Sequence, residues 1–129
     1  MSLYTDIQRS KISVAGSRTG GISGEFNFPG DLELFKGHFP EKSILPGIVQ
    51  IEMVKFCLET ILDKKLFIQS IKKTKFSHFI EPNTPVAVHI TLSSETLNVE
   101  GKIRILARAV LNTPNATAGK TNLVFFDSP

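Results

Sequence analysis

The spacing of hydrophobic positions changes along this chain, and the change separates a helical segment from a series of strands. Between Gly47 and about Asp63, apolar residues recur three and four positions apart and cover most of the helix circumference, as in a helix buried on most sides. The polar residues of this segment form one stripe: Glu52, Lys55, Glu59 and Asp63. We therefore expect one long helix that other parts of the chain surround.

After this helix the pattern alternates with a period of two, as in strands with one buried face. Such runs lie near residues 66–80, 86–92, 102–111 and 120–126, separated by turn-forming residues at 81–85, 98–101 and 112–115. Residues 6–14 alternate weakly, and a Gly20-Gly21 turn leads into residues 22–28, so we expect a hairpin in the first third of the chain. A helix and an antiparallel sheet can each bury a hydrophobic surface on the other, which predicts an α+β fold.

The composition is that of one ordinary domain. The chain has 129 residues, 41% of them hydrophobic, so a core can form without disulfides or metal, and we expect a single domain over residues 1–129. Cys57 is the only cysteine and lies in the apolar helical segment, which indicates a buried structural thiol and a reducing compartment. We recognise neither a secretion signal nor a membrane-spanning run, so we expect a cytoplasmic protein without a membrane partner.

Charge and metal-ligand spacing exclude two further classes. Fifteen basic and twelve acidic residues leave a net charge of +3, which is too balanced to indicate nucleic-acid binding. The three histidines and the cysteine do not have the spacing of a metal site. We therefore expect neither nucleic acid nor metal.

The loop before the helix concentrates residues that restrict the backbone. Pro40 and Pro46 fix their own φ angles and restrict the residue before each, so His38 is held in a stiff turn. Pro46 suits the first turn of a helix, which would leave free backbone N–H groups on Gly47 and Ile48. This helix end favours developing negative charge.

The same loop carries a family resemblance. Gly37-His38-Phe39-Pro40, followed by Pro46-Gly47 and then Glu52, resembles the hotdog-fold β-hydroxyacyl-acyl-carrier-protein dehydratases, and the similarity continues to about Pro85. The resemblance implies a hotdog fold, in which one long central helix is wrapped by a curved antiparallel sheet and which functions as a dimer. It also implies dehydration of a 3-hydroxyacyl thioester on acyl carrier protein to the trans-2-enoyl thioester, in fatty-acid, polyketide or accessory lipid biosynthesis.

The resemblance also implies roles for individual residues. His38 matches the catalytic histidine, Glu52 the catalytic carboxylate, and Gly47 the residue whose N–H polarises the thioester carbonyl. Phe39 and Ile48 are expected to contact substrate, and neither metal nor redox cofactor is implied. These residue types suit their roles: a histidine can act as a base, a carboxyl group as an acid, and a backbone N–H as a hydrogen-bond donor to an oxyanion. In this family the histidine and carboxylate of one site come from opposite subunits, which implies a homodimer or an assembly of dimers.

Three features depart from the family pattern. Ser43 stands where proline is usual, and Phe56 stands where a glutamine commonly follows the catalytic acid by one helical turn. A Leu-Pro-His-Arg-type segment does not precede the first predicted strand. We therefore expect a divergent relative that serves an accessory acyl or polyketide pathway.

Simpler interpretations of the polar residues stay open. His38 could be a loop histidine bonded to backbone, and Glu52 could be an exposed member of the polar stripe. His78 and His89 lie in alternating segments and are expected on the polar faces of strands. Three lysines, Lys72, Lys73 and Lys75, are candidates for docking an acidic carrier protein, although a solvated strand face explains them equally well.

Two other functions fit the same pattern. One is a hotdog thioesterase in which Glu52 directs water at the thioester carbonyl. The other is a non-catalytic dimeric acyl-binding module. The Gly-His-Phe-Pro loop favours the dehydratase, because thioesterases of this fold resemble the loop less.

Overall fold

The computed structural model describes residues 3–35, 44–96 and 103–127. Its elements are α1 (Leu3–Ser10), β1 (Lys11–Ser17), β2 (Gly21–Asn27), the 3-10 helix η1 (Glu33–Phe35), α2 (Gly47–Leu62), β3 (Leu66–Phe76), β4 (Pro85–Thr96), β5 (Ile103–Asn112) and β6 (Thr117–Asp127). No helix in these ranges is long and apolar enough to cross a membrane.

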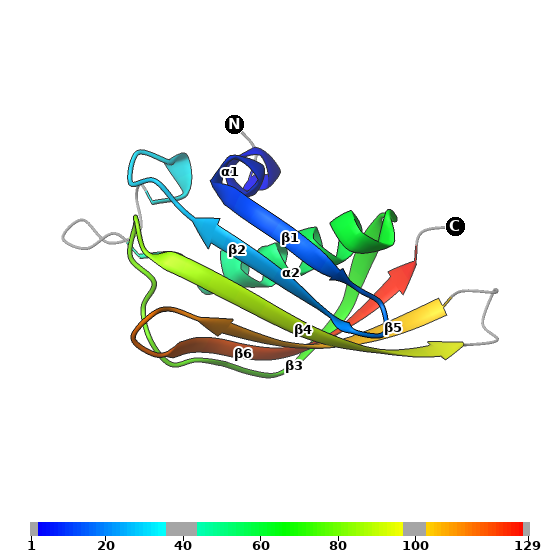
Figure 1. The fold of residues 1–129 in the computed structure, drawn as a ribbon. Coiled ribbons are helices and arrows are strands. Elements are labelled where there is room, and N and C mark those ends of the chain that lie inside the picture. Colours follow the sequence, from blue (N-terminus) through cyan, green and yellow to red (C-terminus); the bar gives the residue numbers. More distant parts are fainter. Residues whose placement is uncertain (1–2, 36–43, 97–102, 128–129) are drawn as a thin grey trace.

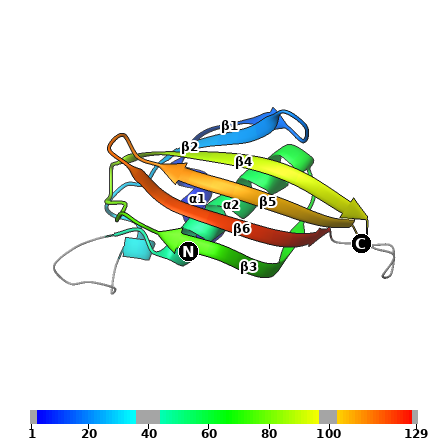
Figure 2. The same cartoon turned by 90° about the horizontal axis from the view of Figure 1, so that it is seen from below.

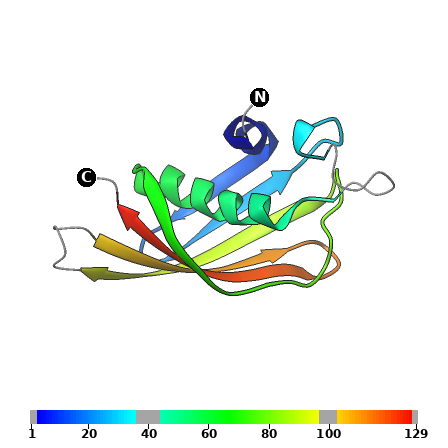
Figure 3. The same cartoon turned by 180° about the vertical axis from the view of Figure 1, so that it is seen from behind.

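In the described part of the chain, six strands form one antiparallel sheet in the order β1-β2-β4-β5-β6-β3. Figure 2 shows this order, with β1 and β3 as the two edges. The sheet is curved, and α2 lies along one of its faces (Figure 1, Figure 3). The predicted antiparallel sheet with a helix packed against it is therefore confirmed.

The hydrophobic core lies between α2 and the facing side of the sheet. β5 buries alternate residues on this side, namely Ile105, Ala107 and Ala109, as a period of two predicts. The residues that α2 buries are Val49, Gln50, Ile51, Met53, Val54, Phe56, Cys57 and Leu58. Removing this apolar surface from water is the main favourable contribution to folding.

The predicted bounds of α2 are confirmed to within one residue. Pro46 is the N-cap, with an extended conformation at φ −62° and ψ 150°, and its carbonyl oxygen accepts the N–H of Val49 at 3.1 Å and of Gln50 at 3.4 Å. Asp63, predicted as the last residue, is the C-cap in the left-handed conformation with φ 51°. Backbone chemistry at both ends therefore fixes the length of the helix.

The strand predicted over residues 6–14 is wrong in its first half, because α1 occupies Leu3–Ser10. Leu3 and Ile7 lie four positions apart and both pack on the core, and the Tyr4 ring centroid is 5.5 Å from that of Phe56 on α2. A helix of eight residues is marginal alone, so its packing against α2 decides the conformation. The hairpin of β1 and β2 follows this helix.

The strand predicted to continue to Ile80 ends at Phe76 instead. Its pairing with β6 shifts register twice along its length, so the alternating pattern does not carry through. Ser77 and His78 then donate their N–H groups to the carbonyl oxygen of Ala118, at 2.8 and 3.4 Å, and the chain turns away from the sheet. His78 is consequently exposed, but it lies in a loop and not on a strand face.

The other predicted turns have mixed outcomes. At Gly20-Gly21 the chain forms the turn between β1 and β2, with φ 87° at Gly21. The turn at 112–115 is also present, closed by a 2.9 Å hydrogen bond from Thr113 N–H to the carbonyl oxygen of Ala116. The predicted turn at 98–101 lies outside the described residues.

Burial of Cys57 makes it unreactive. Its side chain is fully buried, and desolvation raises the pKa of its thiol from an ordinary value of 9.0 to about 12. Because the folded state holds the proton more tightly, this group makes stability fall as the pH rises from about 9 towards 12. The structure therefore agrees with the predicted buried structural thiol.

We predict that native protein at pH 8 reacts very slowly with a thiol-specific reagent. The reactive thiolate would amount to on the order of one thiol in ten thousand at that pH, and the core blocks access. Labelling followed by absorbance should reach one equivalent promptly only in denaturant. Rapid stoichiometric labelling in native buffer would contradict the burial of Cys57.

Candidate active site at the start of α2

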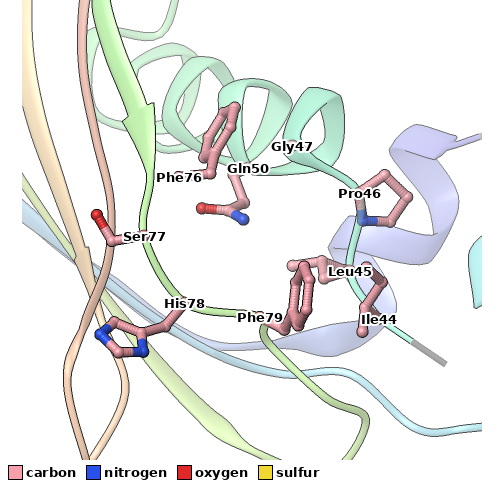
Figure 4. Close-up of a pocket in the computed structure, with 9 residues that line it drawn as sticks. All are labelled: Ile44, Leu45, Pro46, Gly47, Gln50, Phe76, Ser77, His78 and Phe79. Carbon is pink, nitrogen blue, oxygen red and sulfur yellow. The ribbon is translucent and has the colours of Figure 1, made fainter. Parts of the chain in front are cut away.

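A pocket of about 640 Å³ opens at the N-terminus of α2, between this helix and the segment that follows β3 (Figure 4). Its lining is mostly apolar and comprises Ile44, Leu45, Pro46, Gly47, Gln50, Phe76, Ser77, His78 and Phe79. A concave apolar site with a few polar groups is typical of a site for a small ligand.

Backbone hydrogen bonds hold the two walls of this pocket together. Leu45 N–H donates to the carbonyl oxygen of Ile80 at 2.7 Å, which ties the entry of α2 to the segment after β3. The bond from Ser77 N–H to the carbonyl of Ala118 ties the other end of that segment to β6. Backbone hydrogen bonds therefore fix both walls of the pocket relative to α2 and the sheet.

Gly47 brings an aromatic ring close to the helix start. A Cβ atom at this position would lie 2.5 Å from Cε2 of Phe76, which is closer than any side chain tolerates. Phe76 is 43% exposed, so its ring covers the first turn of α2 and still faces the pocket. Glycine is required here because it permits this approach.

The first turn of α2 presents backbone donors at the pocket. Val49 and Gln50 make the first intrahelical bonds, so the N–H groups of Gly47 and Ile48 precede them and have no partner within the helix. The helix N-terminus carries partial positive charge, and Gly47 lies in the pocket wall. This end of the pocket is suited to stabilising an oxygen that gains negative charge.

Ile48 lies outside this pocket. It is 57% exposed and lines a separate pocket of about 280 Å³, together with Leu3, Asp6 and Val49 among others. Its expected contact with substrate is therefore not provided by the pocket at Gly47.

Glu52 also lies outside the lining of the Gly47 pocket. It is half-buried, and no hydrogen bond or ion pair joins it to another residue that the structure describes. The polar stripe does not form a ladder of ion pairs, because Glu59 accepts the Leu66 N–H at 2.9 Å and Asp63 caps the helix. Five helical positions separate Glu52 from Gly47, which places the two about 140° apart around the helix axis.

Two expected site residues, His38 and Phe39, lie outside the described residues. The same holds for Ser43, one of the departures from the family pattern. Ile44 is the first described residue after them, and it lines the pocket. A second departure, Phe56, is buried in the core and packs between the rings of Tyr4 and Phe26.

The three candidate docking lysines are exposed on the edge strand β3. Lys72 and Lys73 line a hollow of about 570 Å³ that also includes Arg108, and Lys75 lies beside Lys120 of β6. None of the three lysines lines the Gly47 pocket. They add basic charge to a surface separate from the pocket.

Several residues of the pocket were not expected from the sequence. Gln50 is the one that a pattern could reveal, because it is a polar residue outside the polar stripe of an apolar helix. Ser77 and His78 enter the pocket because β3 ends early. His89 is exposed on β4, with Nδ1 3.3 Å from the Ser23 hydroxyl, so its expected place on a polar face is confirmed.

No group of three or more potential metal ligands occurs among the described residues.

The fold is that of the hotdog proteins. The ApeI:P dehydratase heterocomplex of Xenorhabdus doucetiae superposes with a TM-score of 0.67 at 20% identity, covering 89% of this chain and 95% of that chain. A hypothetical thioesterase with coenzyme A from Streptococcus pneumoniae TIGR4 also gives a TM-score of 0.67, at 6% identity, over 98% of this chain and 94% of that one. At these identities the likeness shows the fold alone.

The sequence identifies the family within this fold. The model of the ApeI-like family, described as ApeI dehydratase, matches residues 15–109, and the chain belongs to this family. The 3-hydroxyacyl-[acyl-carrier-protein] dehydratase FabZ of Rickettsia typhi is 28% identical over 86 residues, and that of Rickettsia massiliae is 26% identical over the same length. Each match covers 60% of this chain and 59% of the relative. The chain is thus a divergent member of a hotdog dehydratase family.

We predict that Gly47→Ala lowers the free energy of unfolding by about 1–3 kcal/mol, because its methyl group displaces the Phe76 ring. Urea unfolding measures the loss. Phe76→Leu in the same chain should recover most of it. Gly30→Ala is the matched control, since its Cβ would meet no atom closer than 3.5 Å. Equal losses at both glycines, or no relief from Phe76→Leu, would refute the contact.

Proposed function

We propose that the protein dehydrates 3-hydroxyacyl thioesters on acyl carrier protein to trans-2-enoyl thioesters. The observation that carries the proposal is the apolar pocket whose wall includes the N–H of Gly47 at the start of α2, which has no partner in the described part of the chain. Membership of the ApeI-like dehydratase family and the similarity to FabZ proteins support the same reaction. The likeness to the thioesterase supports the shared fold only.

In the proposed reaction, each group has a distinct task. The thioester carbonyl oxygen accepts the Gly47 N–H, which stabilises the negative charge that develops there. The imidazole of His38 removes the proton from C2, and the carboxyl group of Glu52 protonates the 3-hydroxyl as its bond to C3 breaks. Water leaves and the C2–C3 double bond forms. Phe39 contacts the substrate beside His38.

The position of Glu52 supports a site shared between two chains. Glu52 points about 140° away from Gly47 around the helix axis, so it does not reach the pocket of its own chain. We infer that a second chain supplies this carboxyl group in a two-fold dimer. Such a dimer would complete each pocket with one residue from the partner.

The first half of the edge strand β3, before its three lysines, is our proposed place for the partner chain. As a sheet edge it has unpaired backbone groups, and its first half exposes Phe67 and Ile71, at 52% and 45%. The partner can be an identical chain. A related chain is the alternative, since the ApeI:P structure of Xenorhabdus doucetiae is described as a heterocomplex.

An assay with purified protein tests the function directly. A carrier-bound 3-hydroxyacyl thioester should give rising absorbance of the conjugated enoyl thioester without release of free thiol. Free thiol without the enoyl signal would indicate a thioesterase. Binding without either product would indicate a non-catalytic acyl-binding module.

We predict that His38→Ala and Glu52→Gln each lower turnover by roughly 10²–10⁴-fold, the usual scale for loss of a general base or acid. Both variants should unfold at the wild-type temperature, since neither change removes a described core contact. Lys55→Gln is the matched control on α2 and should keep normal turnover. Near-normal turnover of Glu52→Gln would show that Glu52 is not catalytic and is only a member of the polar stripe.

Mixing the two inactive variants tests whether the site is shared. Random pairing after unfolding and refolding makes about half the dimers mixed, and each mixed dimer has one intact site, so about a quarter of all sites should be active. If both residues of a site came from one chain, mixing would restore nothing. An inactive mixture with proven subunit exchange would exclude the shared site.

We predict a separate role for the lysines in binding the acidic carrier. Reversing the charge of Lys72, Lys73 and Lys75 to Glu should slow association with carrier-bound substrate about tenfold at low salt, and less at high salt. Turnover of a small pantetheine thioester should not change. Lys11→Glu, on the opposite sheet edge, is the control. Equal losses on both substrates would indicate damage to β3 instead.

A further inference from the structure

Gln50 is a polar residue buried in the wall of the candidate active site. Its side chain is 2% exposed, and its Oε1 atom has no hydrogen-bond partner among the residues that the structure describes. An unsatisfied buried carbonyl oxygen costs about 1–3 kcal/mol, whereas an apolar side chain of similar shape would cost nothing of this kind. A glutamine at this position therefore calls for a hydrogen-bond donor that the described residues do not supply.

The surroundings of Gln50 leave space for its amide group. Gly119 of β6 has no side chain, and a Cβ atom there would lie 2.5 Å from Gln50 Oε1 and 3.2 Å from Cδ1 of Phe76. Figure 4 shows the amide projecting from α2 into the pocket, with Phe76 on one side and Leu45 and Phe79 on the other. The amide thus lies inside a mostly apolar cavity.

Gln50 and Gly47 lie three positions apart and so occupy neighbouring places on one side of α2, with about 5–6 Å between such positions. One wall of the pocket therefore offers a backbone N–H donor and, beside it, the Gln50 amide group, whose oxygen lies buried against Gly119 without a donor among the described residues. Rotation about the last side-chain bond, which has broad preferences, turns this oxygen toward the pocket. A 3-hydroxyacyl thioester carries the complementary groups. Its C1 carbonyl oxygen accepts a hydrogen bond, and its hydroxyl on C3 donates one.

We propose that Gln50 determines specificity by accepting a hydrogen bond from the 3-hydroxyl group, while the thioester carbonyl binds the Gly47 N–H. This inference rests on the proposed function. The contact fixes the direction of the C3–O bond that must break. The enoyl product has no 3-hydroxyl, so it forfeits the contact and leaves more readily.

The test measures binding in a His38→Ala background, so that turnover of the hydroxylated ligand is slow compared with binding. Two pantetheine thioesters of equal chain length are compared, one with a 3-hydroxyl and one saturated. We expect the parent to bind the hydroxylated ligand about tenfold more tightly, on the scale of one hydrogen bond. Gln50→Met should abolish this preference and leave the affinity for the saturated ligand unchanged.

Two controls separate a binding role from a structural one. Gln8→Met, at an exposed position on α1, should keep the preference. Thermal unfolding of Gln50→Met should occur at or above the parental temperature, because the unpartnered amide is gone. Gln50→Leu provides a second apolar variant if the methionine variant does not fold.

Three results would overturn the inference: no preference in the parent, an unchanged preference in the folded apolar variants, or an equal loss for both ligands. An equal loss for both ligands would mean that Gln50 contacts the pantetheine group, which both ligands share, or that it only packs in the wall of the pocket. Failure of the proposed function is a different observation. Wild-type protein would then form no enoyl product, whatever the binding preference.

Discussion

The burial of α2 against the curved sheet is the constraint on which the rest of the structure depends. Its residues fill the core along almost the whole length of the helix, so its position cannot shift without opening cavities. The N-terminus of α2 is thereby fixed beside the segment after β3, and the Leu45–Ile80 hydrogen bond holds the two together. The candidate site is a consequence of this packing.

The same constraint separates residues that are close in sequence. Gly47 and Gln50 face the pocket, whereas Glu52 and Ile48 point elsewhere around the helix. A helix that is buried on most sides exposes few positions. In α2 these positions face different parts of the molecular surface. We therefore interpret α2 as contributing to two sites, one through its first turn and one through Glu52.

The sequence predicted the parts of the fold that depend on local chemistry. The start of α2 follows from Pro46, and its end follows from the change of period after Asp63. Helix α1 was missed because packing against α2, and not its own short sequence, stabilises it. The early end of β3 depends on register shifts against β6, a strand about fifty residues later that local alternation does not report.

The candidate site was predictable only in part. Gly47 was identified through a motif, and His38 and Phe39 lie outside the described residues. Ser77 and His78 enter the pocket only because β3 ends where it does. Gln50 gave a weak signal, as a lone polar residue among apolar neighbours. Its meaning became clear only from its buried oxygen, which has no partner within the described ranges.

The central claim is that an acyl thioester binds with its carbonyl at the start of α2. Backbone amide shifts of ¹⁵N-labelled protein, titrated with a saturated acyl pantetheine thioester, test it most directly. The account predicts a downfield shift of the Gly47 amide proton on forming a hydrogen bond, with smaller changes at Ile44, Gln50 and Ser77. Changes confined to the hollow around Lys72 and Arg108, with Gly47 unmoved, would contradict it.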